Sequence, residues 1–324
     1  MILMNYTSLS LIIFLMISKC IMVKSIAVSL NRPRFCSSAT WSSSAITFAD
    51  NSTVGDVPNA IFVNTNDSVI ALNTQSRLII IWLNGTNNSK VQNITGSTNP
   101  RSLFIGANNA LYVNNDNKGV SRWIENISEN LLTGEVCFDL FIDDTNNSLY
   151  CSLKFQHKVI KRSLNSSDDQ VLIVAGTGCP GFISNMLNLP HGIFIDENFN
   201  LYIADSLNNR IQMFYSGQLN GITVVGKDSP GTIILNYPSD IVLDADRNIF
   251  IVDTSNDRNV GSTSTGFQCI VGCLGYGTDD KHLAYPLSMA FDSAGNIFVV
   301  DHSNSRIQKF FLSSNSCGKY QHSD

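Results

Sequence analysis

Short apolar runs separated by polar turns fill the second half of the chain and recur at a fixed period. Three similar passages start at Pro190, Pro238 and Pro286, and successive prolines are 48 residues apart. In the first passage, a turn rich in Asp and Asn separates the runs Ile193–Ile195 and Leu201–Ala204. Runs of this length, rich in Ile, Val, Phe and Tyr, predict β-strands rather than helices.

Each passage carries enough runs for a small sheet. Arg210–Phe214 and Ile222–Gly226 complete the first unit, which is predicted to be a four-stranded antiparallel meander. The runs Ile249–Val252 and Ile297–Val300 contain no polar position, so these strands need cover on both faces. A sandwich leaves one face of each sheet wet, whereas a propeller packs each blade between two neighbours, so the pattern favours a propeller.

Degraded copies of the unit occupy the first half of the chain. They start at Pro58, at Pro100 and just before Leu140, which brings the total to six. Large rings at matching third-strand positions are interpreted as packing residues; these are Trp82, Trp123, Phe214 and Phe310.

The last copy lacks a fourth strand. The segment 45–50 resembles the fourth strands of other copies, and we expect it to pair with the last blade and close the ring. The predicted fold is therefore all-β, a six-bladed β-propeller of four-stranded antiparallel blades, over residues 45–312. Residues 28–44 would form an N-terminal segment and 313–324 a C-terminal tail.

The repeats contain P-x-x-(I/M)-x-(hydrophobic)-D, then N-(L/I)-(Y/F)-(I/V)-(A/V)-D, then S-x-N-x-R and I-Q-x-F. With these motifs the chain resembles NHL-repeat proteins, a family of six-bladed propellers. In the first three copies Asn73, Asn115 and Leu153 replace the motif aspartate, and no arginine is in register. The resemblance implies the fold and says little about activity.

Aspartate and arginine recur together, five residues apart, where the second strand ends and the third begins. One interpretation is a charged ligand ring at one face; the other is local capping and pairing within each loop. Repetition of both partners favours local structure for the three pairs Asp205–Arg210, Asp253–Arg258 and Asp301–Arg306.

The first 27 residues are predicted to be a signal peptide. Ser8–Ile17 is an apolar core too short for an ordinary membrane span, and Ser25 and Ala27 provide a small-x-small cleavage site. We therefore expect a secreted, extracellular protein with no membrane span in the mature chain. The alternative is retention by an uncleaved N-terminal anchor.

Asn-x-Ser/Thr sequons are frequent, but none lies beyond residue 165. This distribution suggests a glycan-covered part of the ring and a bare part that is free for a protein partner. The eight candidate glycosylation sites are Asn51, Asn66, Asn84, Asn87, Asn93, Asn126, Asn146 and Asn165.

The cysteines fit an oxidising compartment. Cys36 and Cys317 flank the propeller, and closure of the ring would bring them together as a disulfide. Cys269 and Cys273 are expected on an extended strand, about 13 Å apart, which opposes a shared metal. The sequence leaves open the pairing of Cys137, Cys151, Cys179, Cys269 and Cys273.

The charge pattern excludes nucleic acid as a partner. The net charge is −5 and only 15% of the residues are charged. No basic stripe is available to neutralise phosphates.

Two enzyme classes resemble this fold. In peptidyl-hydroxyglycine lyases, histidines from several blades hold zinc, but only His191 stands at that position here; the matching residues are Asn59, Arg101, Phe138, Ser239 and Leu287. Calcium-dependent lactonases hold a central ion. The recurrent Asp196, Asp244 and Asp292 are instead interpreted as turn caps.

The sequence thus predicts no cofactor, metal or catalytic residue. It favours a non-catalytic, extracellular scaffold that binds a protein or glycan. The alternative is a propeller enzyme, a metal-dependent lyase or a lactonase or other hydrolase, with its site on the axis.

Overall fold

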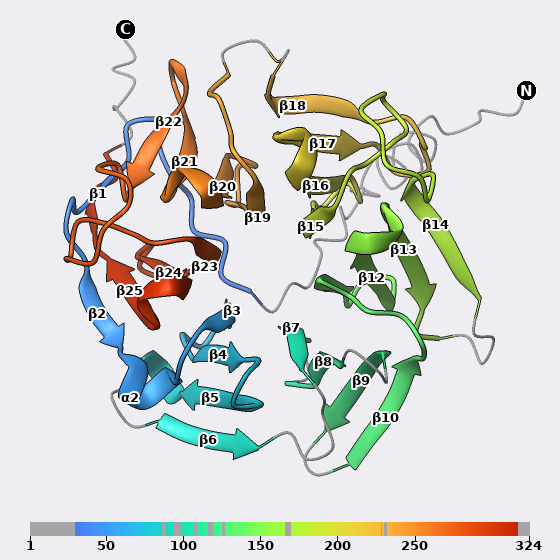
Figure 1. Ribbon diagram of the computed structural model, residues 1–324, viewed down its shortest axis with the longest axis horizontal. Helices are drawn as coiled ribbons and strands as arrows, with labels where there is room; N and C mark the ends of the chain where they lie inside the picture. The colour runs from blue at the N-terminus through green and yellow to red at the C-terminus, as the bar shows by residue number, and fades with distance from the viewer. Residues whose placement is uncertain are drawn as a thin grey trace, which may run out of the picture.

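Six small sheets surround a central axis in the computed structural model (Figure 1). The structure describes residues 30–316 apart from 86–88, 94–98, 107–108, 116–118, 125–126, 166–169, 228 and 230–231. Each inner strand contacts the inner strands of both neighbouring blades, and the last contacts the first. The predicted six-bladed propeller is confirmed.

Every blade is an antiparallel sheet. In the first five blades the strands follow sequence order from the axis outward, and in the last blade an N-terminal strand takes the outermost place. The first three blades comprise β3 (Pro58–Val63), β4 (Val69–Asn73), β5 (Leu78–Trp82) and β6 (Ser89–Asn93); β7 (Pro100–Ile105), β8 (Leu111–Asn115), β9 (Gly119–Ile124) and β10 (Ile127–Leu132); and β11 (Asp139–Asp143), β12 (Ser148–Leu153), β13 (Lys158–Ser163) and β14 (Val171–Gly176).

The next two blades and the last one follow the same plan. They comprise β15 (Pro190–Ile195), β16 (Leu201–Asp205), β17 (Arg210–Phe214) and β18 (Ile222–Gly226); β19 (Pro238–Leu243), β20 (Ile249–Asp253), β21 (Arg258–Thr263) and β22 (Gly266–Val271); and β23 (Pro286–Phe291), β24 (Ile297–Asp301) and β25 (Arg306–Phe310).

Short helices occupy turns. They are α2 (Asn51–Val54) and the 3₁₀ turns η1 (Leu83–Gly85), η2 (Lys154–Gln156), η3 (Ser206–Asn208), η4 (Thr254–Asn256) and η5 (His302–Asn304).

The N-terminal part of the chain completes the last blade. β2 (Ile46–Ala49) pairs antiparallel with β25, and Ile46 lies opposite Lys309. Just outside, β1 (Thr40–Trp41) pairs with β26 (Leu312–Ser314). The predicted closure of the ring is confirmed, with a second strand pair that the sequence did not indicate.

Strand register defines the two faces of the ring. Pro190 lies opposite Asp205, and Arg210 lies opposite both Asp205 and Gly226. The start of an inner strand, the turn between the second and third strands, and the link to the next blade therefore share one face, which we call the link face. The opposite face holds the other two turns of each blade; we call it the hairpin face.

Aromatic rings pack from blade to blade near the axis. Phe104 on β7 lies 4.9 Å from Phe62 and 5.0 Å from Phe141, between ring centroids. Phe141 lies 5.3 Å from Phe194. Such edge-to-face and tilted contacts add to the burial of apolar surface, which is the main stabilising term. Of the predicted packing rings, Trp82, Phe214 and Phe310 are buried.

Residues 30–35, which we call the N-terminal strap, cross the hairpin face near the axis (Figure 1). Leu30 forms a bridge with Asn64, and Phe35 packs against Phe250 and Phe291.

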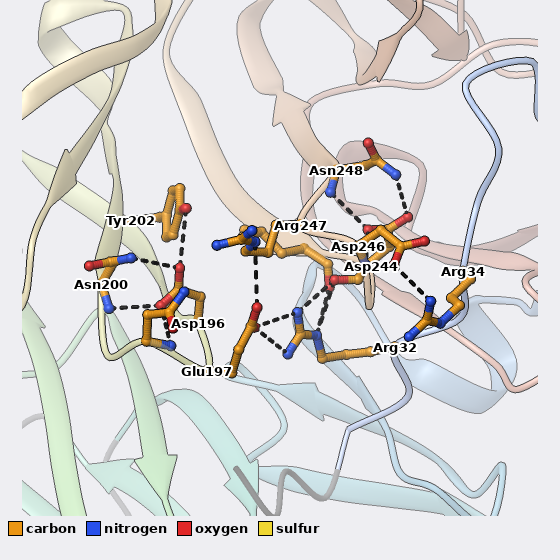
Figure 2. A network of polar contacts seen from close by, with 12 residues as sticks. Arg32, Arg34, Asp196, Glu197, Asn200, Tyr202, Asp244, Asp246, Arg247 and Asn248 are labelled. Carbon is orange, nitrogen blue, oxygen red and sulfur yellow. Dashed lines mark hydrogen bonds and ion pairs between the residues drawn. The ribbon is translucent and has the colours of Figure 1, made fainter. Parts of the chain in front are cut away.

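Arginines fix the middle of the strap (Figure 2). The Arg32 guanidinium donates to the carbonyl of Asp244 at 2.6 Å and pairs with Glu197 at 3.3 Å, and Arg34 pairs with Asp246 at 3.0 Å. The strap links the turns of the fourth and fifth blades.

Candidate functional site

The three Asp–Arg pairs lie on the link face and are buried at their carboxylates. Asp205 has no exposed surface, and its Oδ2 accepts from Arg210 Nε at 2.7 Å. The corresponding distances are 2.9 Å for Asp253–Arg258 and 2.6 Å for Asp301–Arg306. Each carboxylate also accepts a backbone N–H from the preceding link, for example that of Asn188 at 2.6 Å. The three carboxylates are therefore already paired with protein groups.

The arginines extend beyond their aspartates to the links between blades. Arg210 donates to the carbonyls of Phe182, Ile183 and Met186 at 2.7, 3.3 and 3.0 Å. Arg306 likewise donates to three carbonyls, those of Thr278, Asp279 and His282. Arg258 reaches one, that of Ile234 at 2.9 Å. Charge-assisted hydrogen bonds of this kind hold the backbone of each link in place.

The links fixed in this way project apolar side chains into solvent. Phe182 is 77% exposed, Ile234 83% and Tyr276 74%, one from each of three successive links. Other exposed apolar residues of the same face lie in links and second-to-third strand turns; they are Phe155, Ile183, Leu207, Leu274 and Tyr285. Exposed apolar side chains that gather on one face of a protein are typical of a binding site.

The sequons lie mostly elsewhere. Asn66, Asn84, Asn146 and Asn165 are exposed in turns of the hairpin face. Asn51 is exposed in α2 and Asn93 ends β6, while Asn87 and Asn126 lie outside the described residues. Glycosylation of these sites remains a prediction.

The second residues of the inner strands surround the axis at the link face. His191 on β15 is partly exposed there, and its Nδ1 lies 2.8 Å from the Ser239 carbonyl. Because a carbonyl only accepts, Nδ1 carries the proton. Burial, together with the charge of Lys154, lowers the pKa of His191 to about 3. The imidazole is therefore neutral at physiological pH.

Two cations lie beside His191. Arg101 Cζ and Lys154 Nζ each lie 4.6 Å from the centroid of Phe138, and Lys154 Nζ lies 5.3 Å from that of Tyr237. Lys154 is only 9% exposed. Burial, and then the charge of Arg101, lowers the pKa of Lys154 to about 8. We call these five residues, Arg101, Phe138, Lys154, His191 and Tyr237, the axial mouth.

Two carboxylates stand further along the axis. Asp139 and Asp240 line an axial cavity of about 80 Å³. Burial raises the pKa of Asp139 to about 8, with a further contribution from the charge of Asp240, and burial raises the pKa of Asp240 to about 6. Gly192 takes the equivalent position in the fourth blade, between the blades of Asp139 and Asp240. A Cβ atom at Gly192 would lie 2.6 Å from Asp240 Cα. Only glycine allows this approach.

Each axial carboxylate also links neighbouring blades. Asp139 accepts the N–H of Ile193 at 2.8 Å, and Asp240 accepts that of Met289 at 3.0 Å. The sequence analysis missed both aspartates. A signal was available in the sequence. In its own repeat, each aspartate stands one position after the one that His191 takes in the fourth blade, and it is a charged residue in a mainly apolar inner strand.

The recurrent aspartates of the hairpin face cap their turns. Asp196 accepts the N–H of Asn198 and both the N–H and the side-chain amide of Asn200, at 2.8–2.9 Å. Asp244 and Asp292 make the equivalent bonds to Asn248 and Asn296. Within the described part of the chain, no cluster of three or more His, Cys, Asp or Glu residues is placed to hold a metal.

The disulfides correct one expectation. Cys269 and Cys273 are not held apart on an extended strand: β22 ends at Val271, and Gly272 with φ of 70° turns the chain back. The two cysteines form a disulfide with Cα atoms 5.7 Å apart.

The other cysteines are placed as follows. Cys137 is bonded to Cys151, and Cys179 is an exposed free thiol. Cys36 is disulfide-bonded, but Cys317 lies outside the described residues, so their pairing remains a prediction. Cys36 N–H donates to Asn315 Oδ1 at 2.8 Å, which places the two ends of the propeller together.

The predicted signal peptide lies outside the described residues. Among the helices that the structure does describe, none has the length and hydrophobicity to cross a bilayer.

Comparison with known proteins supports the fold. Residues 283–310 match the NHL repeat family model, and no curated protein sequence matches the chain. Virginiamycin B lyase from Staphylococcus aureus is 12% identical, with a TM-score of 0.56, over 83% of this chain and 98% of that one. A gluconolactonase from Xanthomonas campestris is 13% identical, with a TM-score of 0.61, over 88% and 96%.

A third solved structure, a protein of unknown function from Bacteroides thetaiotaomicron, is 12% identical, with a TM-score of 0.63, over 88% and 75% of the two chains. At such identities these likenesses establish a shared propeller fold alone. The chain is thus a six-bladed propeller with an NHL repeat in its last blade.

Proposed function

We propose that the protein is a secreted, non-catalytic binding module that presents its link face to an extracellular protein. The observation that carries this proposal is the clamping of exposed apolar side chains. Arg210 bonds the carbonyls of Phe182 and Ile183, and Arg258 bonds that of Ile234. A side chain displayed on a fixed backbone loses less conformational entropy on binding.

The chemistry of the link face favours a protein over a glycan. Ile183, Leu207, Ile234 and Leu274 are aliphatic, and they offer no hydrogen bonds to sugar hydroxyls. Such side chains are instead suited to the apolar centre of a protein interface. Sequons that are exposed on the hairpin face would direct glycans away from this surface.

The state of the cysteines supports an extracellular location. Two disulfides are formed among the described residues, and disulfides persist in oxidising environments. Secretion would follow from cleavage of residues 1–27.

The test is affinity capture from extracellular fluid with three purified proteins: wild type, a link-face variant and a control. The variant is Phe182→Ser, Ile234→Ser, Tyr276→Ser. The control is Tyr215→Ser, Leu219→Ser, which changes exposed residues of the hairpin face. We expect a partner that binds wild type and control equally and loses at least tenfold in affinity for the link-face variant. Equal capture by all three proteins would contradict the proposal.

A propeller enzyme is a second candidate, and the axial groups favour it. Asp139, Lys154 and His191 all have strongly shifted pKa values near one channel, and such shifts cluster at catalytic sites. Lactone hydrolysis and lyase assays on wild type and Asp139→Asn test this candidate. Turnover of a panel substrate that Asp139→Asn abolishes would favour an enzyme; no turnover would favour the binding module.

A further inference from the structure

At its repeat position, Lys154 departs from the pattern that three other blades follow. At the start of the second-to-third strand turn, Thr74 and Ser206 donate to the carbonyls of Pro100 and Pro238, both at 2.6 Å. His302 Nδ1 lies 2.8 Å from the carbonyl of Pro58. Each of these side chains connects its blade to the next. Lys154 takes the same position in the third blade without making that bond.

The ammonium group of Lys154 instead meets two aromatic faces. Its nearest partners are Phe138 and Tyr237. Among the residues that the structure describes, no hydrogen-bond acceptor or carboxylate is found for it, although the side chain is about nine-tenths buried. A buried charge with no counter-ion is costly, because aromatic faces replace only part of its hydration.

We propose that the axial mouth is a binding site for a carboxylate group, held by Lys154 and Arg101. Both cations lie 4.6 Å from the centroid of Phe138, so they are close neighbours. A carboxylate placed between them, beside the edge of the ring rather than over its negative face, could accept hydrogen bonds from both. The approach is from the link face, where the inner strands begin.

The charges around the site support an anion rather than a cation. Lys154 and Arg101 repel one another, and this repulsion is the second cause, after burial, that lowers the pKa of Lys154. Burial holds Asp139 largely protonated at neutral pH, because the pKa of this group is raised to about 8. Asp240, with a pKa raised to about 6, is then the ionised member of the axial pair, and its carboxylate accepts the N–H of Met289. A carboxylate bound at the mouth would relieve the repulsion between the cations and meet little opposing charge from Asp139.

This inference does not depend on the proposed protein partner. The carboxylate has two sources: a free organic acid, or an acidic side chain of a protein. Acetate represents the first, and the capped tripeptide acetyl-Gly-Glu-Gly-amide represents the second.

The experiment is an NMR titration of protein carrying ¹³Cε-lysine, at constant ionic strength. The Lys154 signal is assigned by its loss in Lys154→Met. Lys161 serves as the matched control, since its Nζ also lies near an aromatic ring, 5.1 Å from that of Tyr150, outside the axial mouth. Lys154→Met is expected to fold with equal or higher thermal stability, because it removes an unpaired buried charge.

A bound carboxylate should shift the Lys154 signal saturably and raise the pKa of its amine by about one unit, while Lys161 stays unchanged. One unit corresponds to tenfold tighter binding by the protonated amine. A response to both probes would show that free acids occupy the site, and a response to the peptide alone would assign it to protein side chains. If neither probe moves the Lys154 signal, or if both lysines respond alike, the proposal is wrong.

Discussion

Removal of the Arg210 guanidinium should destabilise the propeller far more than removal of the equivalent group at Arg258. Arg210→Met keeps most of the side-chain length and leaves Asp205 buried without its cation. Breaking a buried pair by removing one partner costs about 3–5 kcal/mol. The Arg210 side chain is 10% exposed and that of Arg258 is 24% exposed, so solvent screens the second pair more.

The number of link carbonyls sets the size of the difference. Arg210 and Arg306 each bond three of them, and Arg258 bonds one. At about 1 kcal/mol for each hydrogen bond, the substitution at Arg258 should cost about 2 kcal/mol less than the other two. Because Arg306 and Arg210 make the same number of bonds, their substitutions should lower the free energy of unfolding by similar amounts.

The assay is urea unfolding at pH 7, followed by tryptophan fluorescence, for wild type, Arg210→Met, Arg258→Met and Arg306→Met. We expect the unfolding midpoint to fall in the order wild type, Arg258→Met, then the other two variants together. Hydrogen exchange should also quicken in the link 181–187 of Arg210→Met, because its carbonyls lose their donors. A midpoint for Arg258→Met equal to or below those of both other variants would refute the reasoning.

Further predictions concern pH, the N-terminal strap and the cysteines. Because burial raises the pKa of Asp139 to about 8, the folded state keeps a proton that the unfolded chain has lost. The free energy of unfolding should therefore fall as pH rises from about 4 to about 8, by at most about 1.4 kcal/mol per unit for one proton. Asp139→Asn should flatten this slope in urea unfolding at several pH values; an unchanged slope would exclude Asp139 as its source. Arg32→Ala should cost about 2–3 kcal/mol, since charged hydrogen bonds to two carbonyls and Glu197 are lost, whereas Arg34→Ala, 76% exposed, should cost under about 0.5 kcal/mol; calorimetry that gives equal effects would contradict this. Non-reducing peptide mapping should recover a Cys36–Cys317 link and alkylate Cys179 without reduction, and recovery of Cys317 as a free thiol would disprove the link.

The repeat pattern was sufficient to predict the blades and their closure. The strand runs around Pro190 and the pairing of residues 45–50 with the last blade could be inferred because each rests on a local apolar pattern. The capping interpretation of Asp196 likewise rested on turn residues close to it in sequence. Where the physics is local, one sequence carries the information.

The axial groups could not be predicted in the same way. Asp139 and Asp240 are 101 positions apart in sequence, and only closure of the ring brings both to one cavity. The hydrogen bonds from Arg210 to the link carbonyls could not be predicted either. Every residue has a backbone carbonyl, so the sequence does not mark which of them accept from an arginine. The error at Cys273 arose because a strand was extended through Gly272, where a positive φ reverses the chain.

Closure by β2 has a consequence for biosynthesis. The strand that β2 pairs with, β25, follows all the strands of the first five blades in the sequence. During translation, β2 must therefore wait without its sheet partner until these five blades have been made. Until then the nascent chain carries an unpaired strand edge, and the ring closes only when β25 has been synthesised.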